Sequence, residues 1–203
     1  MFITKKYITK KVERKSFMFV IATTRFNTNT WNENYKWREK NKYSGCIYGS
    51  PFEMPKGILL ESNIFMIEMH NDENKIKGIG FLKNNTRKNK YYNIYTDKNY
   101  NRFTYLGNYR LDISEMSRKE IFYMEILERL IFKTSRHLKR GCGITRIPDR
   151  ILNNKFINFL NVFKNMFLRK YFMMDTSEIN NENKKRIKIK LNNEKKDIKY
   201  NIM

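Results

Sequence analysis

The sequence predicts a single α+β domain in which a curved antiparallel or barrel-like β-sheet carries a short N-terminal helix and two C-terminal helices. Three observations support this class: a length of 203 residues, β-branched apolar runs in the first half, and helical periodicity in the second half. The length allows one buried core but is short for two domains of typical size. We place the domain at residues 16–175, between a basic N-terminal arm (1–15) and a basic polar C-terminal tail (176–203), both expected to be flexible.

The first expected elements are a strand, a helix and a loop. FMFVIATTRF (17–26) is an apolar, β-branched run of strand length, and TWNENYKWREK (30–40) follows as a short helix with Thr30 as its N-cap. GCIYGSPFEMPKG (45–57) contains three glycines and two prolines. This density of turn-forming residues predicts a loop rather than a regular element.

A β-hairpin is expected next. NIFMIEMHNDENKIKGIGFLKN (63–84) consists of two apolar runs split by four polar residues at 71–74, the pattern of two strands joined by a four-residue turn. Segments 91–95 and 102–111 alternate aromatic and polar residues, as half-buried antiparallel strands do. Together these segments predict a sheet of four to six strands.

Two helices are expected in the last third of the chain. Ser117 and Glu120 have the spacing of a capping box, and apolar residues at 121, 124, 127 and 131 share one helical face, which predicts a helix over 117–133. Asp149 is a candidate N-cap for a second helix, whose apolar residues recur at helical spacing from Leu152 to Phe167. The segment between these helices is a loop.

The charge of the chain predicts a polyanionic partner. The sequence has 42 Lys and Arg residues against 20 Asp and Glu residues, for a formal net charge of +22. Between Arg129 and Lys170 the only acidic residue among eleven basic ones is Asp149, so this stretch holds nearly half of the net charge. Such a field attracts nucleic acid or an anionic membrane surface.

The segment TSRHLKRGCGITRIP (134–148) is the strongest candidate for a binding site. It is either a solvated connection between helices or a loop whose two glycines let backbone amides approach a phosphate beside several cations. We favour phosphate contact. The expected RNA-binding residues in and after this loop are Arg136, His137, Lys139, Arg140, Arg146 and Arg150.

A second basic patch lies at 83–92. Arg87, Lys88 and Lys90 precede two tyrosines, which either stack on unpaired bases or begin the core of a strand. Both alternatives stay open from the sequence. Arg102 completes the set of residues expected to contact RNA.

Catalytic chemistry is not expected. Cys46 and Cys142 lack the CxxC or Cys/His spacing of a zinc site, and Cys46 is expected to be an inert thiol. Glu68, His70 and Asp72 stand at alternate positions and mimic an acid, base or metal set. The sequence has no HExxH motif, P-loop or nucleophile elbow. We therefore expect no enzyme activity, no metal and no cofactor.

The chain is expected to be a soluble cytoplasmic protein. Its N-terminus carries lysines where a secretory signal has an apolar run, and no segment approaches 18 uninterrupted apolar residues. Two cysteines are too few for a disulfide framework, which indicates a reducing compartment.

Four stretches of the chain carry a resemblance to a known family. They are GCIYGSPFEMPKGI, IFMIEMHNDENKIKGIGFLKN, NYNRFTYLGNYRLD, and LIFKTSRHLKRGCGITRIP with FKNMF. Over about residues 45–167 the sequence resembles the ribosome dormancy (hibernation) factors first described in microsporidia, with relatives in other eukaryotes and in large viruses.

The resemblance implies a non-enzymatic protein that binds the tRNA exit (E) site of the cytoplasmic ribosome. Such a protein excludes tRNA and obstructs mRNA near the small-subunit head and the L1 stalk, which silences translation. The implied partners are ribosomal RNA and ribosomal proteins, with no membrane and no small-molecule substrate. Individual contacts do not transfer from the family, so the residues named above rest on charge and loop position alone.

Two other classes of function stay open. An RNA- or modified-base-reading module of the small β-barrel kind, not tied to the ribosome, would need a concave aromatic pocket. A nucleic-acid-processing enzyme would need carboxylates or histidines that converge in a cleft.

Overall fold

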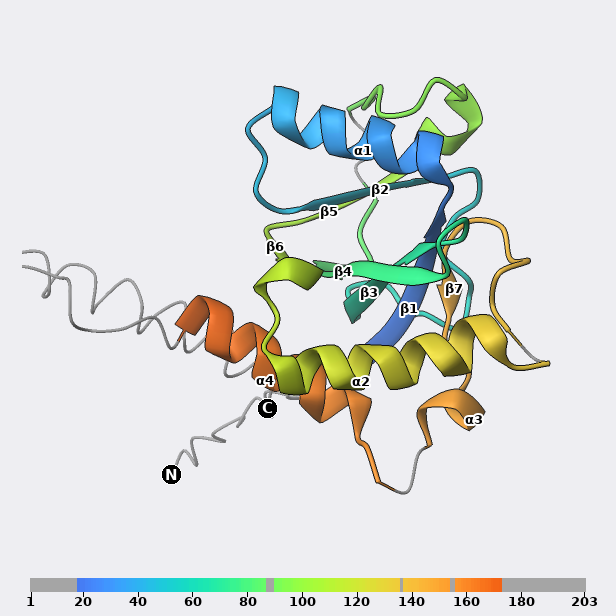
Figure 1. Ribbon diagram of the computed structural model, residues 1–203. Helices are drawn as coiled ribbons and strands as arrows, with labels where there is room; N and C mark the ends of the chain where they lie inside the picture. The colour runs from blue at the N-terminus through green and yellow to red at the C-terminus, as the bar shows by residue number, and fades with distance from the viewer. Residues whose placement is uncertain (1–17, 87–89, 136, 154–155, 173–203) are drawn as a thin grey trace, which may run out of the picture.

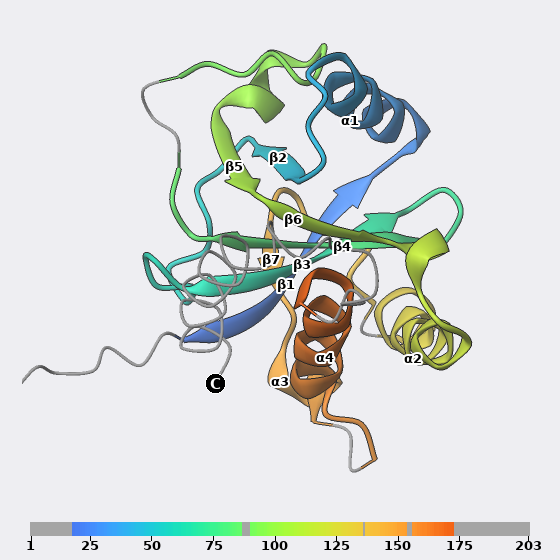
Figure 2. The same ribbon diagram turned by 90° about the vertical axis from the view of Figure 1, so that its left-hand side faces the viewer.

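The structure, a computed structural model, describes residues 18–86, 90–135, 137–153 and 156–172. The fold is α+β, as the sequence predicts. Helix α1 (Thr28–Lys40) covers a two-stranded sheet, which lies over a five-stranded sheet, and the helices of the second half of the chain cover the opposite face (Figures 1 and 2). The expected basic arm (1–15) and the polar tail (176–203) lie outside the described residues.

The five-stranded sheet is open and mixed. Its order is β6-β4-β3-β1-β7. The strands are β1 (Phe19–Phe26), β3 (Asn63–His70), β4 (Lys75–Lys83), β6 (Tyr109–Asp112) and β7 (Thr145–Arg146). β1 runs parallel to β3, and all other neighbours are antiparallel. The predicted α+β class is therefore correct, but the sheet is mixed rather than antiparallel, and it does not close into a barrel. The crossover through α1 returns the chain to the same end of the sheet, which makes the β1–β3 pair parallel.

The hairpin expected at 63–84 is confirmed. β3 and β4 pair from Asn63 opposite Lys83 to His70 opposite Lys75, with a register shift between Glu68 and Met69. The four residues 71–74 form the turn, as the sequence predicts.

The prediction of a loop at 45–57 is wrong for its first half. β2 (Cys46–Ser50) pairs with β5 (Phe103–Gly107) to make the two-stranded sheet. This strand has glycine at position 49 because a Cβ there would collide with the carbonyl oxygen of Tyr100 and lie 2.8 Å from the Tyr95 ring. The glycine thus serves close packing of neighbouring segments rather than a turn.

Two other strand predictions need correction. Residues 91–95 form no regular strand. The single strand expected at 102–111 is interrupted at Asn108 and becomes β5 and β6, which belong to different sheets. This connection through one residue joins the two sheets at one edge.

Helix α1 begins earlier than the sequence predicts. Its N-cap is Asn27, whose side chain accepts a hydrogen bond from the Thr30 amide at 2.8 Å. Thr30 occupies the third helical position and accepts a hydrogen bond from the Asn27 amide in return. The threonine is therefore the second member of a capping box rather than the cap itself.

The helix expected at 117–133 is confirmed. Ser117 caps α2 (Arg118–Glu128) in a capping box with Glu120, and the helix continues as one π-helical turn, η3 (Arg129–Lys133). The second predicted helix is broken into α3 (Asp149–Leu152) and α4 (Phe159–Phe172). Pro148 occupies the cap position of α3, and Asp149 is its first residue.

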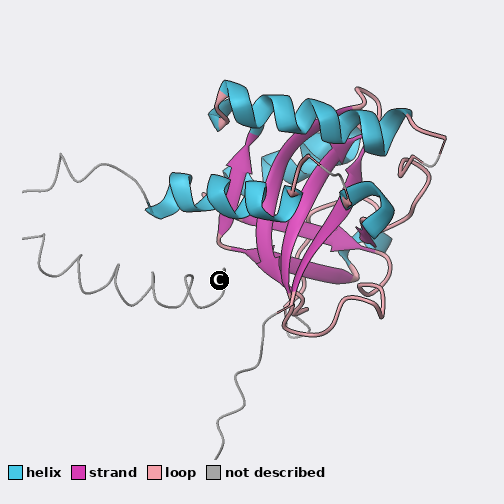
Figure 3. Ribbon diagram, turned by 90° about the horizontal axis from the view of Figure 1, so that it is seen from below, coloured by secondary structure: helices cyan, strands magenta, loops and turns pink. Residues whose placement is uncertain are grey.

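The core has two parts, one on each face of the five-stranded sheet. Phe65, Ile67 and Met69 of β3 face the part beneath α2 and α4, and Ile64 and Met66 face the two-stranded sheet. α2 and α4 lie side by side across their face of the sheet (Figure 3). Two short 3-10 helices, η1 (Lys98–Asn101) and η2 (Ile113–Glu115), complete the fold. No helix in the described ranges combines the length and apolar character that crossing a bilayer requires.

Candidate nucleic-acid interface

The basic loop at 134–148 leaves η3 and folds back on it before entering β7. The Leu138 amide donates to the carbonyl of Ile131 at 2.7 Å, and the His137 amide donates to the carbonyl of Thr134 at 3.1 Å. The Lys139 amide donates to Nδ1 of His137 at 3.3 Å. Leu138 is buried. The loop is thus a folded structure with its own hydrogen bonds.

Arg25, the last but one residue of β1, fastens both limbs of this loop. Its Nε donates to the carbonyl of Leu138 on the incoming limb. Its Nη1 donates to the carbonyl of Gly143 at 3.0 Å and to Oγ1 of Thr145 at 3.1 Å on the outgoing limb. One guanidinium therefore closes the loop across its base.

The two glycines have separate roles in this closure. A Cβ at Gly141 would lie 2.5 Å from Cζ of Arg25, so only glycine lets the backbone pass over the guanidinium. Gly143 adopts φ +65°, which is strained for other residues, and a Cβ there would lie 2.7 Å from Oγ of Ser50.

Arg25 carries a positive charge without a carboxylate partner in the described part of the chain, because its three hydrogen-bond acceptors are all neutral. Burial lowers the pKa of its guanidinium, and the neighbouring Cys142 offsets part of that effect. Arginine keeps its charge even so. The site therefore contains a half-buried cation whose charge is not neutralised by the described residues.

Several of the predicted cations are accessible in the structure. Arg140 is exposed on the loop, and Lys139 and His137 beside it are partly exposed. Arg150 is exposed on α3. Arg102 is exposed after η1, its guanidinium 5.7 Å from the ring centroid of Phe103.

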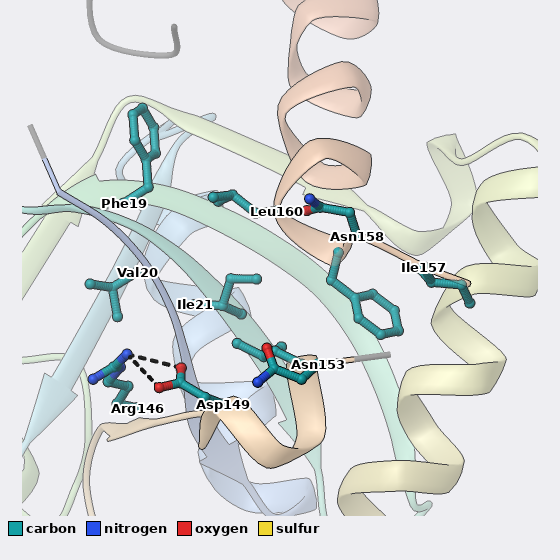
Figure 4. A pocket seen from close by; sticks show the side chains of 11 residues that line it. Phe19, Val20, Ile21, Arg146, Asp149, Asn153, Ile157, Asn158 and Leu160 are labelled. Carbon is teal, nitrogen blue, oxygen red and sulfur yellow. Dashed lines mark hydrogen bonds and ion pairs between the residues drawn. The ribbon is translucent and has the colours of Figure 1, made fainter. Parts of the chain in front are cut away.

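Arg146 is partly neutralised. It lies on β7, and its Nη2 reaches the two carboxylate oxygens of Asp149 at 3.0 and 3.3 Å. The pair borders a pocket of about 320 Å³ between β1, α3 and the start of α4 (Figure 4). Phe19 and Leu160 line the other side of that pocket, which gives it a largely apolar wall.

Lys90 is not part of the loop region. Its Nζ lies 5.1 Å from the ring centroid of Tyr92, which in turn packs against Trp37 near the end of α1. The loop instead meets the start of α1, where Thr30 shares a pocket with Cys142. Thr30 and Trp37 are separated by about 10 Å along the helix axis.

The other members of the two predicted patches lie outside the described residues. They are Arg87, Lys88 and Arg136. Of the two tyrosines after Lys90, Tyr91 is exposed and Tyr92 packs on Trp37, so the first is available for stacking and the second is a packing residue.

The three alternating polar residues of β3 and its turn, Glu68, His70 and Asp72, all make hydrogen bonds to neighbouring groups. Asp72 accepts hydrogen bonds from the amide and the hydroxyl of Thr28 at the start of α1, which lower the pKa of its carboxyl. His70 is buried and accepts a hydrogen bond from the Glu73 amide at 3.4 Å. Each group is engaged in holding local structure.

Glu68 of β3 forms a buried ion pair with Arg110 of β6 in the same five-stranded sheet, and Tyr48 of the two-stranded sheet contacts this pair. Arg110 donates to Glu68 twice, through Nε at 2.9 Å and Nη2 at 2.6 Å, and the hydroxyl of Tyr48 donates to it at 2.7 Å. Burial is the largest single effect and lowers the pKa of Arg110, but the charge and hydrogen bonds of Glu68, with smaller contributions from Tyr48 and Asp112, together raise that pKa. Burial also raises the pKa of the nearby Cys46 thiol to about 12, with a smaller contribution from Glu68.

Sequence reasoning did not identify Arg25 or the pocket around it. The available signal was a single charged residue inside the apolar β1 run, FVIATTRF. A charge there needs polar partners, and these come from a loop more than 110 residues later in the chain.

Comparisons with protein-family models, with curated proteins and with solved structures give no match. Among the residues that the structure describes, no group of three or more His, Cys, Asp or Glu side chains could hold a metal ion.

Proposed function

We propose that the chain binds RNA phosphates through the loop at 134–148 and acts as a ribosome-binding dormancy factor. The observation that carries the proposal is the closure of this loop by Arg25, which holds its backbone in one shape while Lys139 and Arg140 stay accessible. Neither cation forms an ion pair with a described residue. Cations held this way on a fixed backbone suit contact with a phosphate chain.

Choice of the ribosome as the partner rests on the sequence resemblance over about residues 45–167 and on the net charge of +22. In this proposal the protein occupies the E site of the cytoplasmic ribosome, near the small-subunit head and the L1 stalk. It contacts ribosomal RNA and ribosomal proteins, excludes tRNA and obstructs mRNA. A compact cationic domain suits a slot lined by RNA.

The proposed action is occupancy rather than catalysis. A protein that blocks a site inhibits in proportion to the number of sites that it fills, whereas a catalyst inactivates many ribosomes in turn. We expect inhibition of cell-free translation to reach completion near one protein per ribosome, with ribosomal RNA left intact. Inhibition far below that ratio would contradict this mode of action.

The test of the proposal is co-sedimentation with purified eukaryotic cytoplasmic ribosomes at several salt concentrations. Lys139→Glu with Arg140→Glu should weaken binding and reduce the slope of log affinity against log salt by about 2, because two phosphate contacts are lost. The matched control is Arg118→Glu with Lys119→Glu, another adjacent pair of exposed cations. They lie at the N-terminal end of α2, whereas the basic loop follows the C-terminal end of that helix.

The control pair should leave affinity nearly unchanged. Its new carboxylates lie in the first turn of α2, where the helix dipole favours negative charge, so the fold should not suffer. Equal loss of binding in both variants would show that only net charge matters. Free protein at the top of a low-salt gradient would overturn the ribosome proposal, and retained binding to free RNA would then favour an RNA-reading module.

A further inference from the structure

A small polar pocket lies beside the basic loop, where β1, the start of α1 and the loop meet. Its volume is about 230 Å³. Its lining includes Thr24, Arg25, Asn71, Tyr95, Tyr100 and Cys142. Pockets that bury a whole small molecule measure about 300–1,000 Å³. This one has room for one group of a larger ligand.

Arg25, which lines this pocket, has one hydrogen-bond donor without a described acceptor. Its Nε and Nη1 are used by the loop, but Nη2 has no hydrogen-bond acceptor among the described residues. The donor is part of a cation that has no carboxylate partner in the same part of the chain. A ligand with an acceptor oxygen or nitrogen would accept a hydrogen bond from Nη2 of Arg25.

Two further groups in the pocket lack partners. Thr24 is only 5 % exposed, and its hydroxyl makes no hydrogen bond within the described ranges. Asn71 donates from Nδ2 to the carbonyl of Lys139 at 3.1 Å, while its buried Oδ1 has no partner in the part of the chain that the structure describes. A hydroxyl both donates and accepts, and an amide oxygen only accepts.

Arg25 and Asn71 both bind the same short stretch of the loop. Arg25 binds the carbonyl of Leu138, and Asn71 binds the carbonyl of the next residue, Lys139. Consecutive residues place their Cα atoms about 3.8 Å apart. The pocket lining therefore holds one donor, on Arg25, and one amide acceptor, on Asn71, whose side chains meet the loop at adjacent residues.

Aromatic rings form one side of the pocket. Tyr100 is partly exposed and packs edge-to-face on the buried Tyr95, with ring centroids 6.1 Å apart. The hydroxyl of Tyr95 is occupied by Asn34 at 3.1 Å. The ring of Tyr100 is therefore held in place by a neighbour that has its own anchor, which suits stacking on a flat ligand.

A nucleobase fits these groups better than a phosphate does. A phosphodiester offers only acceptors, so it could satisfy Arg25 but would leave the Asn71 oxygen without a donor. Every nucleobase carries both an acceptor and an N–H donor on its edge, and it has a flat face for Tyr100. We propose that this pocket receives one unpaired nucleobase of the RNA strand whose phosphates contact the basic loop. The proposal rests on the proposed RNA-binding function.

Protection of Cys142 from alkylation tests the proposal on the unaltered protein. Cys142 is exposed and lines the pocket, whereas Cys46, the second cysteine of the chain, is buried and protonated at neutral pH. The rate of reaction with iodoacetamide, a neutral reagent, is measured by mass spectrometry with each of the dinucleoside monophosphates ApA, CpC, GpG and UpU. An abasic ribose dimer with the same single phosphodiester is the control.

At least one dinucleotide should slow the alkylation of Cys142 severalfold and saturably, while the abasic dimer has no effect. Equal protection by the abasic dimer would identify a phosphate site and overturn the base assignment. Absence of protection by every dinucleotide would also overturn it.

Pocket-filling substitutions separate this inference from the proposed function. Cys142→Trp should occupy the pocket and lower the affinity for single-stranded RNA at least severalfold, whereas Leu60→Trp, the same bulky ring at an exposed position outside the pocket lining, should leave it unchanged. Thermal unfolding checks that both variants fold. If Cys142→Trp binds RNA and ribosomes normally, the pocket is not used, although the proposed function stands. If the unaltered protein binds neither, both proposals fail.

Discussion

Gly141 passes over the guanidinium of Arg25 so closely that a Cβ at position 141 would lie 2.5 Å from Cζ. The arginine cannot simply move aside, because it is held by the carbonyls of Leu138 and Gly143 and by the hydroxyl of Thr145. Loop shape and arginine position are therefore set by each other. Both the exposed cations and the pocket depend on this contact.

Gly141→Ala should disrupt the basic loop. The added methyl group must displace the guanidinium or the backbone, and loss of the charged hydrogen bonds should lower the free energy of unfolding by about 1–2 kcal/mol. Urea unfolding and RNA binding measure the two effects. Gly57→Ala is the matched control, since no atom lies within 4 Å of a Cβ there. Equal behaviour of the two variants would show that the contact with Arg25 does not shape the loop.

Arg25→Lys should separate charge from geometry. Lysine keeps the positive charge but lacks the planar fork that reaches both limbs of the loop at once. We expect faster hydrogen exchange at residues 138–145 and weaker RNA binding, with Arg25→Met more severe in both. Exchange as slow as in the unaltered protein would mean that other contacts hold the loop.

How far the sequence predicts the fold depends on whether the determining contacts are local. The β3–β4 hairpin and the Ser117 cap of α2 follow from residues only a few positions apart, and both are confirmed. The parallel pairing of β1 with β3 depends on a crossover of more than 30 residues, which the apolar pattern of β1 does not reveal. Gly49 resembles a turn residue in the sequence, but it lies in β2, where a side chain would collide with the Tyr100 carbonyl and the Tyr95 ring.

The same distinction applies to the candidate site. The run of cations from His137 to Arg140 is visible in the sequence, and the structure places it on one loop. Arg25 and Asn71 come from β1 and from the turn after β3, and they meet the loop only in the folded protein. The pairing of Arg146 with Asp149 was equally out of reach, because it depends on the geometry of the turn into α3.

Glu68→Gln should be strongly destabilising. It would leave the charge of Arg110 buried with its neighbouring Asp112 as the remaining carboxylate partner, and breaking a buried pair costs about 3–5 kcal/mol. The double variant Glu68→Leu with Arg110→Met should lose much less than the sum of the two single changes. A double-mutant cycle by urea denaturation measures the coupling. Additive losses would show that the two side chains act independently.

Glu120 should make the stability of the junction between α2 and α4 dependent on pH. Its carboxylate accepts the Ser117 amide at 2.7 Å and Nη2 of Arg169 at 2.8 Å, and these bonds outweigh partial burial and lower its pKa. A lowered native pKa means that the stabilisation is complete above the unfolded pKa of about 4.3 and is lost as the pH falls through the native pKa.

Glu120→Gln keeps a side chain that can complete the capping box but removes the charge, so it should lower the free energy of unfolding by about 1 kcal/mol at pH 7. The difference from the unaltered protein should shrink as the pH is lowered from 5 toward 3, because protonation then removes the same charge from Glu120 itself. Glu125→Gln, an exposed change on the same helix, is the control and should show little difference at either pH. Urea unfolding across this range measures both. A difference between Glu120→Gln and the unaltered protein that stays constant with pH would mean that the ion pair with Arg169 contributes nothing and that the amide has acted through packing alone.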